Sequence, residues 1–426
     1  MSESITPTTQ HFSPAASLAA LGAKVNQLDI FGPIRTNVQI NQKTVKHTPT
    51  DKLYDAFISL LAGAHGLVEI NTRLRADPAL QHAFGRQACA EQSVVQETLN
   101  ACTEENVRQL QQALDGIYQR HSQAVQHDYH AHVQLLDVDM SGMPCGPKAA
   151  FATKGYFAGQ YHRRGRQLGR VLATAYEEVV ADRLFAGNVQ LIKALQPLVE
   201  AAEETLHLDE AKRKRTIIRV DAGAGTEHDL NWLLLRGYEI MAKEYAGKRV
   251  LRLAEMVTEW VQDPDWPERS FGWVTEPAVG YVRPVQRIAV RCRRQDGTFA
   301  YGILISSLSV EQILTLLARP NSSATDPVAV LAAYVNFYDQ RGGGIETSLK
   351  GDKQGLGLTS RNKKRFEAQH MLVLLGSLAH NVVVWARRWL AIPQLHAYGP
   401  LRMVLAKSMV FHLPVEANMR CVLRTG

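Results

Sequence analysis

Apolar positions along the first third of this chain recur at helical spacing. In "TDKLYDAFISLLAG" the apolar residues stand at 53, 57, 60 and 61, which predicts a helix with one buried face. Similar spacing continues to about residue 125 and predicts a helical region. Residues 1–48 are polar and rich in Thr, Gln and Ser, so a loose arm is expected there.

Two of the expected helices follow each other closely. "SVVQETL" contains Ser93 with Gln96 three residues later, a capping-box pattern that predicts a helix start. "TEENVRQLQQALDGIYQ" follows after a very short connection. The pair is compatible with a helix-turn-helix that reads DNA, and a generic helical pair would show the same pattern.

The pattern changes after residue 128. "HVQLLDVDMSG" and "RTIIRVDAGAG" are short apolar runs that end in Asp and a nearby Gly, as buried strands do. "NVQLIKALQPLVEAAEETL" and "EHDLNWLLLRG" have helical spacing, and "YEIMAKEY" is a further strand candidate. Strands that alternate with helices predict an α/β fold.

A β-rich insertion is expected to interrupt the α/β pattern. "RIAVRCRR" and "FAYGILISSL" flank the turn "QDGT", which predicts a hairpin in an insertion that leaves the sheet and returns to it. Helical spacing resumes after residue 326. The expected organisation is an N-terminal arm with a helical domain (1–128), a first α/β part (129–247), the insertion (248–325), a second α/β part (326–395) and a C-terminal tail (396–426).

Composition narrows the class of protein. The 426 residues are 46% apolar and carry a formal net charge of +7, with pI near 9.1, so a globular protein is expected rather than a disordered one. The positive charge is clustered in "YHRRGRQLGR", "AKRKR", "RCRR", "RNKKR" and "ARR", a distribution that favours a nucleic-acid partner.

Other features argue against export, a membrane span and a zinc site. The N-terminus has no basic stretch followed by an apolar run, so no signal peptide is expected. The most apolar segment, "MLVLLGSLAHNVVVWARRWLAI", contains His, Asn and two Arg, so we expect a buried helix rather than a membrane span. The five cysteines are far apart and none forms a CxxC pair, which favours a reducing compartment and no structural zinc.

Three carboxylates stand where chemistry is expected. Asp139 and Asp221 end the two buried strands, and Glu346 lies in the glycine-rich stretch "YDQRGGGIETSLKGDK". Each Asp has an ordinary explanation, a hydrogen-bonded turn; Asp137 is an alternative to Asp139. Together the three oxygen ligands suit Mg²⁺ or Mn²⁺, and two such ions can drive phosphodiester cleavage.

Cations surround the third acid. On a helix, Glu346, Lys350 and Lys353 share one face, and Tyr338 and Arg341 precede them. We expect Tyr338, Arg341, Lys350 and Lys353 to hold DNA phosphates beside a metal-binding Glu346. A charged surface helix is the simpler interpretation, but it does not explain the three consecutive glycines.

A second basic group lies between the first two expected strands. Arg163, Arg164 and Arg166 in "YHRRGRQLGR" are spaced closely enough to follow a DNA backbone, because arginine binds phosphate oxygens well.

These blocks resemble the DDE transposases of bacterial insertion sequences. The resemblance rests on "LLDVDMSG", "LFAGN", "IIRVDAGAG" with "LLLRGYEIMAKEY", and "YDQRGGGIETSLKGDKQGLGL" before "FEAQHMLVLLGSLAHNVVVWARRWL". It is strongest for the branch with a Tyr-Arg-Glu-Lys signature, matched here by Tyr338, Arg341, Glu346 and Lys353. Four residues rather than three separate Arg341 from Glu346, and the first Asp is followed by "MS" instead of a Gly-Thr-like end.

The resemblance implies an RNase H-like catalytic domain, with the insertion between Asp221 and Glu346. It implies two Mg²⁺ (or Mn²⁺) ions on Asp139, Asp221 and Glu346, cleavage at transposon ends and strand transfer into target DNA. The expected partners are double-stranded DNA and a second copy of the chain in the bacterial cytoplasm, with no membrane. Two alternatives stay open: a catalytically silent DNA-binding regulator of transposition, and a metal-dependent nuclease without strand transfer.

Overall fold

The structure, a computed structural model, describes residues 11–44, 46–155, 157, 160, 162–317 and 326–389, and the backbone of two short strands at 411–413 and 422–423. The chain divides into two compact units. The first contains residues 1–122, 143–153 and 349–426, and the second contains residues 123–142 and 154–348. The expected C-terminal tail, 396–426, lies outside the described residues except for those two strands.

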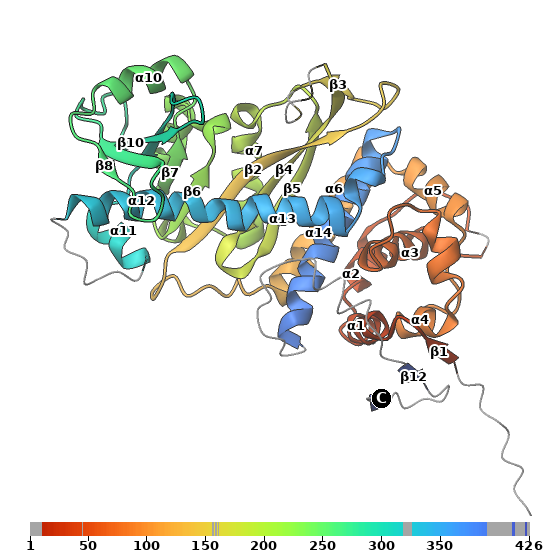
Figure 1. Ribbon diagram of the computed structural model, residues 1–426. Helices are drawn as coiled ribbons and strands as arrows, with labels where there is room; N and C mark the ends of the chain where they lie inside the picture. The colour runs from red at the N-terminus through yellow and green to blue at the C-terminus, as the bar shows by residue number, and fades with distance from the viewer. Residues whose placement is uncertain are drawn as a thin grey trace, which may run out of the picture. The chain divides into compact units, whose positions relative to one another are not determined.

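The first unit is mainly helical (Figure 1). Its helices are α1 (Ala16–Gln27), α2 (Gly32–Asn37), α3 (Pro49–Leu61), α4 (Pro78–Ala83), α5 (Gln92–Ala101), α6 (Glu104–His121), most of α13 (Thr347–Gly355) and α14 (Phe366–Trp389). Its strands β1 (His11–Ser13), β12 (Phe411–Leu413) and β13 (Val422–Leu423) form a small antiparallel sheet.

In the part that the structure describes, residues 11–44, the N-terminal segment is not the loose arm that its polar composition suggested. It forms α1 and α2, and apolar residues such as Leu18, Leu21 and Ile34 on these helices are buried. The polar residues lie between regularly spaced apolar ones, and this spacing, rather than mean polarity, determines whether a helix packs.

The caps of the N-terminal helices differ in part from expectation. Helix α3 is capped by Thr48, whose hydroxyl accepts from the Asp51 amide in a capping box. Helix α5 begins after Glu91, which makes no side-chain cap, so the Ser93 capping box is wrong. A capping box does begin α6, at Thr103 and Asn106, because there the Ser/Thr residue precedes the first helical turn.

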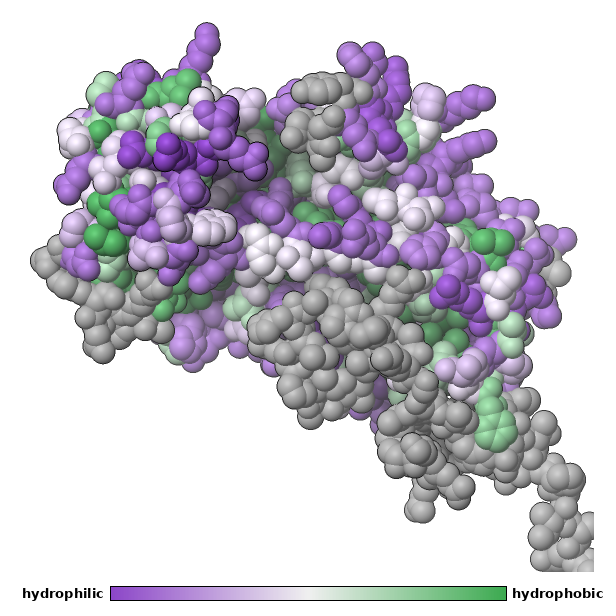
Figure 2. Space-filling view, viewed as in Figure 1, coloured by the Kyte–Doolittle hydropathy of each residue, from purple (hydrophilic) through white to green (hydrophobic). Residues whose placement is uncertain are grey.

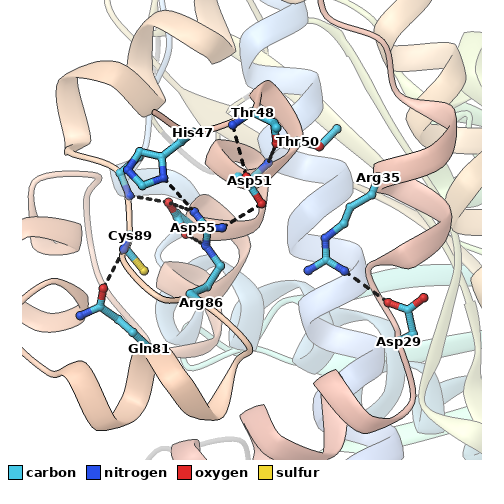
Figure 3. A network of polar contacts seen from close by, with 11 residues as sticks. Asp29, Arg35, His47, Thr48, Thr50, Asp51, Asp55, Gln81, Arg86 and Cys89 are labelled. Atoms are coloured by element: carbon cyan, nitrogen blue, oxygen red, sulfur yellow. Dashed lines mark hydrogen bonds and ion pairs between the residues drawn. The ribbon is translucent and has the colours of Figure 1, made fainter. Parts of the chain in front are cut away.

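A buried ion pair fixes helix α3 against the segment after α4 (Figure 3). Arg86 donates from Nε to Asp55 Oδ1 at 2.9 Å and pairs with Asp51 at 2.8 Å. The second Asp55 oxygen accepts from the Ala90 amide. Since the Asp55 side chain is fully buried, these bonds compensate for its lost hydration.

Helix α14 is buried, as its sequence predicted. By length and composition it is apolar enough to cross a membrane, but 94% of its most apolar window is buried inside the protein. It packs against α3, α5 and α6 within the first unit. Its polar residue His380 is satisfied internally, with Nδ1 2.8 Å from Asp352 Oδ1.

The second unit is a mixed α/β structure. Its strands are β2 (Gln134–Pro144), β4 (Arg164–Ala173), β5 (Glu178–Ala186), β6 (Thr216–Val220), β7 (Glu239–Lys243), β8 (Val261–Gln262), β9 (Arg269–Trp273), β10 (Gln286–Arg293) and β11 (Phe299–Ser306), with β3 at Thr153–Lys154. Its helices are α7 (Leu191–Leu206), α8 (Glu210–Arg213), α9 (Glu227–Leu235), α10 (Gly247–Glu255), α11 (Val310–Leu316) and α12 (Pro327–Arg341).

The strands form one sheet in the order β4-β2-β6-β7-β11-β10-β9-β8, with β5 paired to β4. Strands β2, β6 and β7 are mutually parallel, whereas β4 and β5 form an antiparallel hairpin. A parallel neighbour needs a crossover, and α7 and α9 occupy the connections into β6 and β7.

The expected hairpin at "QDGT" is confirmed, because β10 and β11 pair along their full length. The expectation that the insertion leaves the sheet is wrong. Leu304, Ile305 and Ser306 of β11 pair with β7, so the inserted strands extend the same sheet. This pairing occupies the edge of β7, whose backbone N–H and C=O groups would otherwise be open to other chains.

Helix α12 lies across the inserted part of the sheet (Figure 1). Its apolar residues, among them Leu331, Tyr334 and Phe337, pack in one cluster with Phe271 of β9 and Ile288 of β10. The face seen in Figure 2 is mainly hydrophilic, with small, separate apolar patches. These apolar residues of α12 are buried, and α12 is thus fixed on the sheet before it reaches the glycine-rich stretch.

Candidate active site

Asp139 and Asp221 directly follow the last paired residues of two neighbouring parallel strands, because Val138 of β2 is in register with Val220 of β6. Asp221 follows the end of β6, but β2 continues through Asp139 to Pro144, so the expectation that Asp139 ends its strand is wrong. Parallel neighbours lie about 4.8 Å apart, which places the two acids side by side where the pairing of β2 with β6 stops. Asp221 also forms the expected turn, since its Oδ1 accepts from the Gly223 amide at 2.8 Å.

Glu346 reaches the same region through Arg341. Helix α12 continues into a π-helical turn, Gly342–Glu346. Nη2 of Arg341 lies 3.1 Å from Asp139 and donates to the Val138 carbonyl at 2.8 Å, and its Nη1 lies 3.5 Å from Glu346. One guanidinium therefore joins the first and third acids.

Burial raises the pKa of the Asp139 carboxyl group to about 6. The positive charge of Arg341 lowers this pKa, and the negative charges of Asp221 and Glu346 raise it. The pKa of Tyr338 is also raised by burial and responds to the same three acids. Asp221 and Glu346 are thus close enough to Asp139 for their charges to shift its pKa.

Asp137 has a different role from Asp139. It is fully buried and accepts two hydrogen bonds from Arg219, Nε at 2.6 Å and Nη2 at 2.8 Å, with a third from Thr174 Oγ1 at 2.7 Å. Arg219 also donates to the Phe337 carbonyl of α12. With its oxygens bonded in this way, Asp137 fastens β2, β6 and α12 together, and Asp139 is the acid that faces the other two.

A close approach to neighbouring side chains explains one of the three consecutive glycines, Gly344. A Cβ on Gly344 would lie 2.9 Å from the Thr174 side chain and 3.1 Å from Asp137 Oδ2, whereas a Cβ on Gly343 would meet open space. Gly344 therefore lets the π-turn approach the Asp137–Arg219 pair, and this close approach carries Glu346 toward Asp139.

The expected DNA-contacting residues divide into exposed and buried ones. Arg163 and Arg164 are exposed, but Arg166 is only 1% exposed, so its expected contact with DNA is not supported. Arg341 is also buried and pairs with Asp139, so it holds a carboxylate rather than a phosphate. The inward direction of both arginines follows from their places on β4 and at the end of α12.

The remaining members of the signature are accessible. Tyr338 is half-buried in the second unit. Lys350 and Lys353 lie on the part of α13 that belongs to the first unit, where Lys350 is exposed and Lys353 half-buried. Their role as DNA contacts stays a prediction.

A cavity of about 210 Å³ lies beside Tyr338. Its polar lining includes Lys243, Arg269, Tyr301 and Asp339, and Arg269 donates to Asp339 at 2.5 Å. The inserted strands thus supply one wall of a hollow beside Tyr338, which their sequence alone did not indicate.

The donor chemistry suits a hard divalent cation, because the converging ligands are carboxylate oxygens. Among the described residues, however, no group of three or more His, Cys, Asp or Glu side chains is set closely enough to enclose a metal ion. The Glu346 side chain is 61% exposed, and Arg341, which also pairs with Asp139, connects it to the site. The residues therefore fit the ion in type.

Because the folded state raises the pKa of Asp139 from 3.8 to about 6, it binds this proton more tightly than the unfolded chain does. The resulting stabilisation is present below about pH 4 and is lost as the pH rises through 6. The loss is about 3 kcal/mol at 1.36 kcal/mol per pKa unit.

We expect the stability of Asp139→Asn to lack this pH dependence, because the variant has no ionisable group at this position. Urea unfolding with EDTA, across the acid-to-neutral range, measures the free energy of unfolding. Parallel curves for the two proteins would contradict the burial of an ionisable group at this position.

No protein-family model and no curated protein matches this chain. Among solved structures, it is similar to "Cryo-EM structure of piggyBac transposase synaptic complex with hairpin DNA (SNHP)" with a TM-score of 0.48 and 10% sequence identity. The similarity covers 94% of this chain and 82% of that chain. At this level of similarity the comparison carries no argument about function, which has to be based on the residues themselves.

Proposed function

We propose that this protein is a DDE-type transposase of a bacterial insertion sequence that cleaves DNA phosphodiester bonds and joins the ends to target DNA. One observation carries the proposal. Asp139 and Asp221 directly follow the last paired residues of two adjacent parallel strands, and Arg341 contacts both Asp139 and Glu346. In an α/β sheet, ligands bind beyond the carboxyl ends of the parallel strands.

The strand order supports an RNase H-like catalytic domain. The hairpin β4–β5 precedes β2, and parallel β6 and β7 follow it on the other side. If β2, β4, β5, β6 and β7 are numbered 1 to 5 in chain order, their order across the sheet is 3-2-1-4-5, which is the arrangement of RNase H-like sheets. Asp139 lies on the first of these strands, and Asp221 directly follows the fourth. The inserted strands between Asp221 and Glu346 extend this core from β7.

Each residue of the site has a separate task in this proposal. Asp139, Asp221 and Glu346 would hold Mg²⁺ or Mn²⁺, which when bound activates a water and stabilises the leaving 3′ oxygen. Arg341 holds the Asp139 carboxylate and the middle of β2 in place. Tyr338, Lys350 and Lys353, with Arg163 and Arg164, would bind phosphates of the transposon end, and two copies of the chain would hold the two ends.

One observation favours a catalytically silent DNA-binding protein as the second candidate. The guanidinium of Arg341 already neutralises Asp139 and contacts Glu346, so two of the three acids have a counter-ion without any metal. If Glu346 stays paired with Arg341, it would not bind a metal ion, and the protein would bind DNA ends without cutting them.

The test is a cleavage assay with purified protein, labelled DNA ends from the flanks of its gene, a target plasmid and Mg²⁺. The proposal expects metal-dependent nicks at the ends and joined products in the plasmid. Cleavage without joined products would identify the nuclease alternative. Binding without cleavage in Mg²⁺ and in Mn²⁺ would contradict the proposal and identify the silent regulator.

A further inference from the structure

An exposed aromatic ring lies in a basic part of the first unit, remote in sequence from the signature residues. Phe151 is 59% exposed. It belongs to a loop whose Ala150 amide donates to the Lys364 carbonyl at 2.8 Å, which fixes the loop against the segment before α14. Its ring meets the ring of Phe366 edge-on, with centroids 4.8 Å apart.

The backbone of Phe151 is unusual. Its φ is +58°, in the left-handed region that bulky residues rarely adopt. A residue held in this region points to a functional constraint when its surroundings enforce the conformation. Here the neighbouring turn, in which the Thr153 amide donates to the Phe151 carbonyl at 2.9 Å, and the hydrogen bond at Ala150 hold the loop while the ring stays exposed to solvent.

Cations stand on both segments that carry the ring. Lys148 lies on the loop, and Lys364 and Arg365 lie on the segment before α14; all three are exposed. Arg365 donates to the Asn100 carbonyl at 2.6 Å, and its Nε lies 3.7 Å from Glu367. The other arginine of "RNKKR", Arg361, is buried and bonds the Ser59 and Ala64 carbonyls, so it does not belong to this surface.

An aromatic ring among exposed cations suits nucleic acid. Lysine and arginine bind phosphates, and an aromatic side chain stacks on an unpaired base or inserts between base pairs. One exposed ring without an amphipathic helix offers little apolar surface to a membrane. The combination therefore favours DNA over a lipid surface.

We propose that Lys148, Phe151, Lys364 and Arg365, the Phe151 patch, form a second DNA-contact surface in which the Phe151 ring packs against bases. The inference rests on the proposed function only for the identity of DNA as the ligand. It does not depend on the three acids, and so it can hold or fail independently of catalysis.

The base contact is tested with Phe151→Ala on the full chain. The probe is a labelled mixed-sequence duplex with a short single-stranded gap that contains 2-aminopurine. We expect roughly a tenfold or greater loss of affinity, an unchanged salt slope and loss of the fluorescence change on binding, whereas Phe151→Tyr should behave as the wild type. The control is Phe12→Ala, a phenylalanine of the same unit with 57% exposure.

The phosphate contacts are tested with the double variant Lys148→Ala/Lys364→Ala. Its log–log salt slope should flatten by about two, one for each lost contact, while the 2-aminopurine signal at saturation persists. Lys43→Ala, an exposed lysine of the same unit, is the charge control and should flatten the slope less. Circular dichroism on heating checks that each variant is folded.

The outcomes separate this inference from the proposed function. Wild-type affinity and fluorescence in Phe151→Ala, or an unchanged slope in the double variant, would overturn it. A change in binding to anionic phospholipid vesicles, with DNA binding unchanged, would assign the surface to lipid and also overturn it. DNA binding that depends on the patch in a protein that never cuts DNA would support it while the transposase proposal fails.

Discussion

Replacement of Glu346 by glutamine is expected to abolish metal-dependent DNA cleavage while binding to the transposon ends persists. Glutamine keeps the size and most of the hydrogen bonding of Glu346 but loses the charge that a divalent ion needs. The loss should exceed the 10- to 100-fold typical of residues that only orient a metal ligand. Gel shift and Mg²⁺-dependent cleavage of the same labelled DNA measure the two properties.

Lys353→Ala is the matched comparison on the same helical stretch. It should weaken end binding and flatten the log–log salt slope by about one, because one phosphate contact is lost. Wild-type cleavage by Glu346→Gln would show that this carboxylate is not a metal ligand. An unchanged salt slope in Lys353→Ala would place that lysine on the solvated face of the helix.

Removal of either partner of the Asp137–Arg219 pair is expected to cost on the order of 3–5 kcal/mol of folding free energy. Both side chains are fully buried, so Asp137→Ala leaves an unpaired guanidinium inside the protein. The same change also removes the bonds between Asp137 and Arg219 that join β2 to β6 next to the candidate acids. Urea denaturation followed by circular dichroism measures the loss.

The double variant Asp137→Ala/Arg219→Met tests the cause. It removes both charges and should recover much of the lost stability, because no unpaired ion is left in the interior. The surface control is Lys214→Ala, which breaks an exposed pair with Glu210 and should change stability by less than about 1 kcal/mol. A single variant as stable as this control would contradict a structural role for the buried pair.

Several features of the fold could be predicted from local sequence. The strands that carry Asp139 and Asp221, the helices α7, α9 and α14, and the β10–β11 hairpin at "QDGT" all stand where apolar periodicity and turn residues placed them. These signals are local, since a strand or helix is set by which of its own residues face inward. The helices α1 and α2 were missed because mean polarity was given more weight than the spacing of the apolar residues.

The sequence also contained a signal that was not used. Arg219 lies in the middle of the apolar run "TIIRV", and Asp137 lies in the middle of "LLDVD". A charged residue inside a buried strand requires a partner, and the register that places Asp137 opposite Arg219 provides it. A pairing of the two runs could thus have been predicted, and with it the choice of Asp139 over Asp137.

The sequence by itself determined the three acids, the apolar runs that lead to Asp139 and Asp221, and the composition of the glycine-rich stretch. Only the tertiary structure decided that Arg341 turns inward to Asp139, that Arg166 is buried, and that the insertion extends the sheet from β7. Each of these depends on contacts between segments far apart in the chain; the Arg341–Val138 bond alone spans 203 residues. No local pattern encodes such a contact, because the direction of a long cationic side chain is set by the charge and the space it meets after the elements have packed.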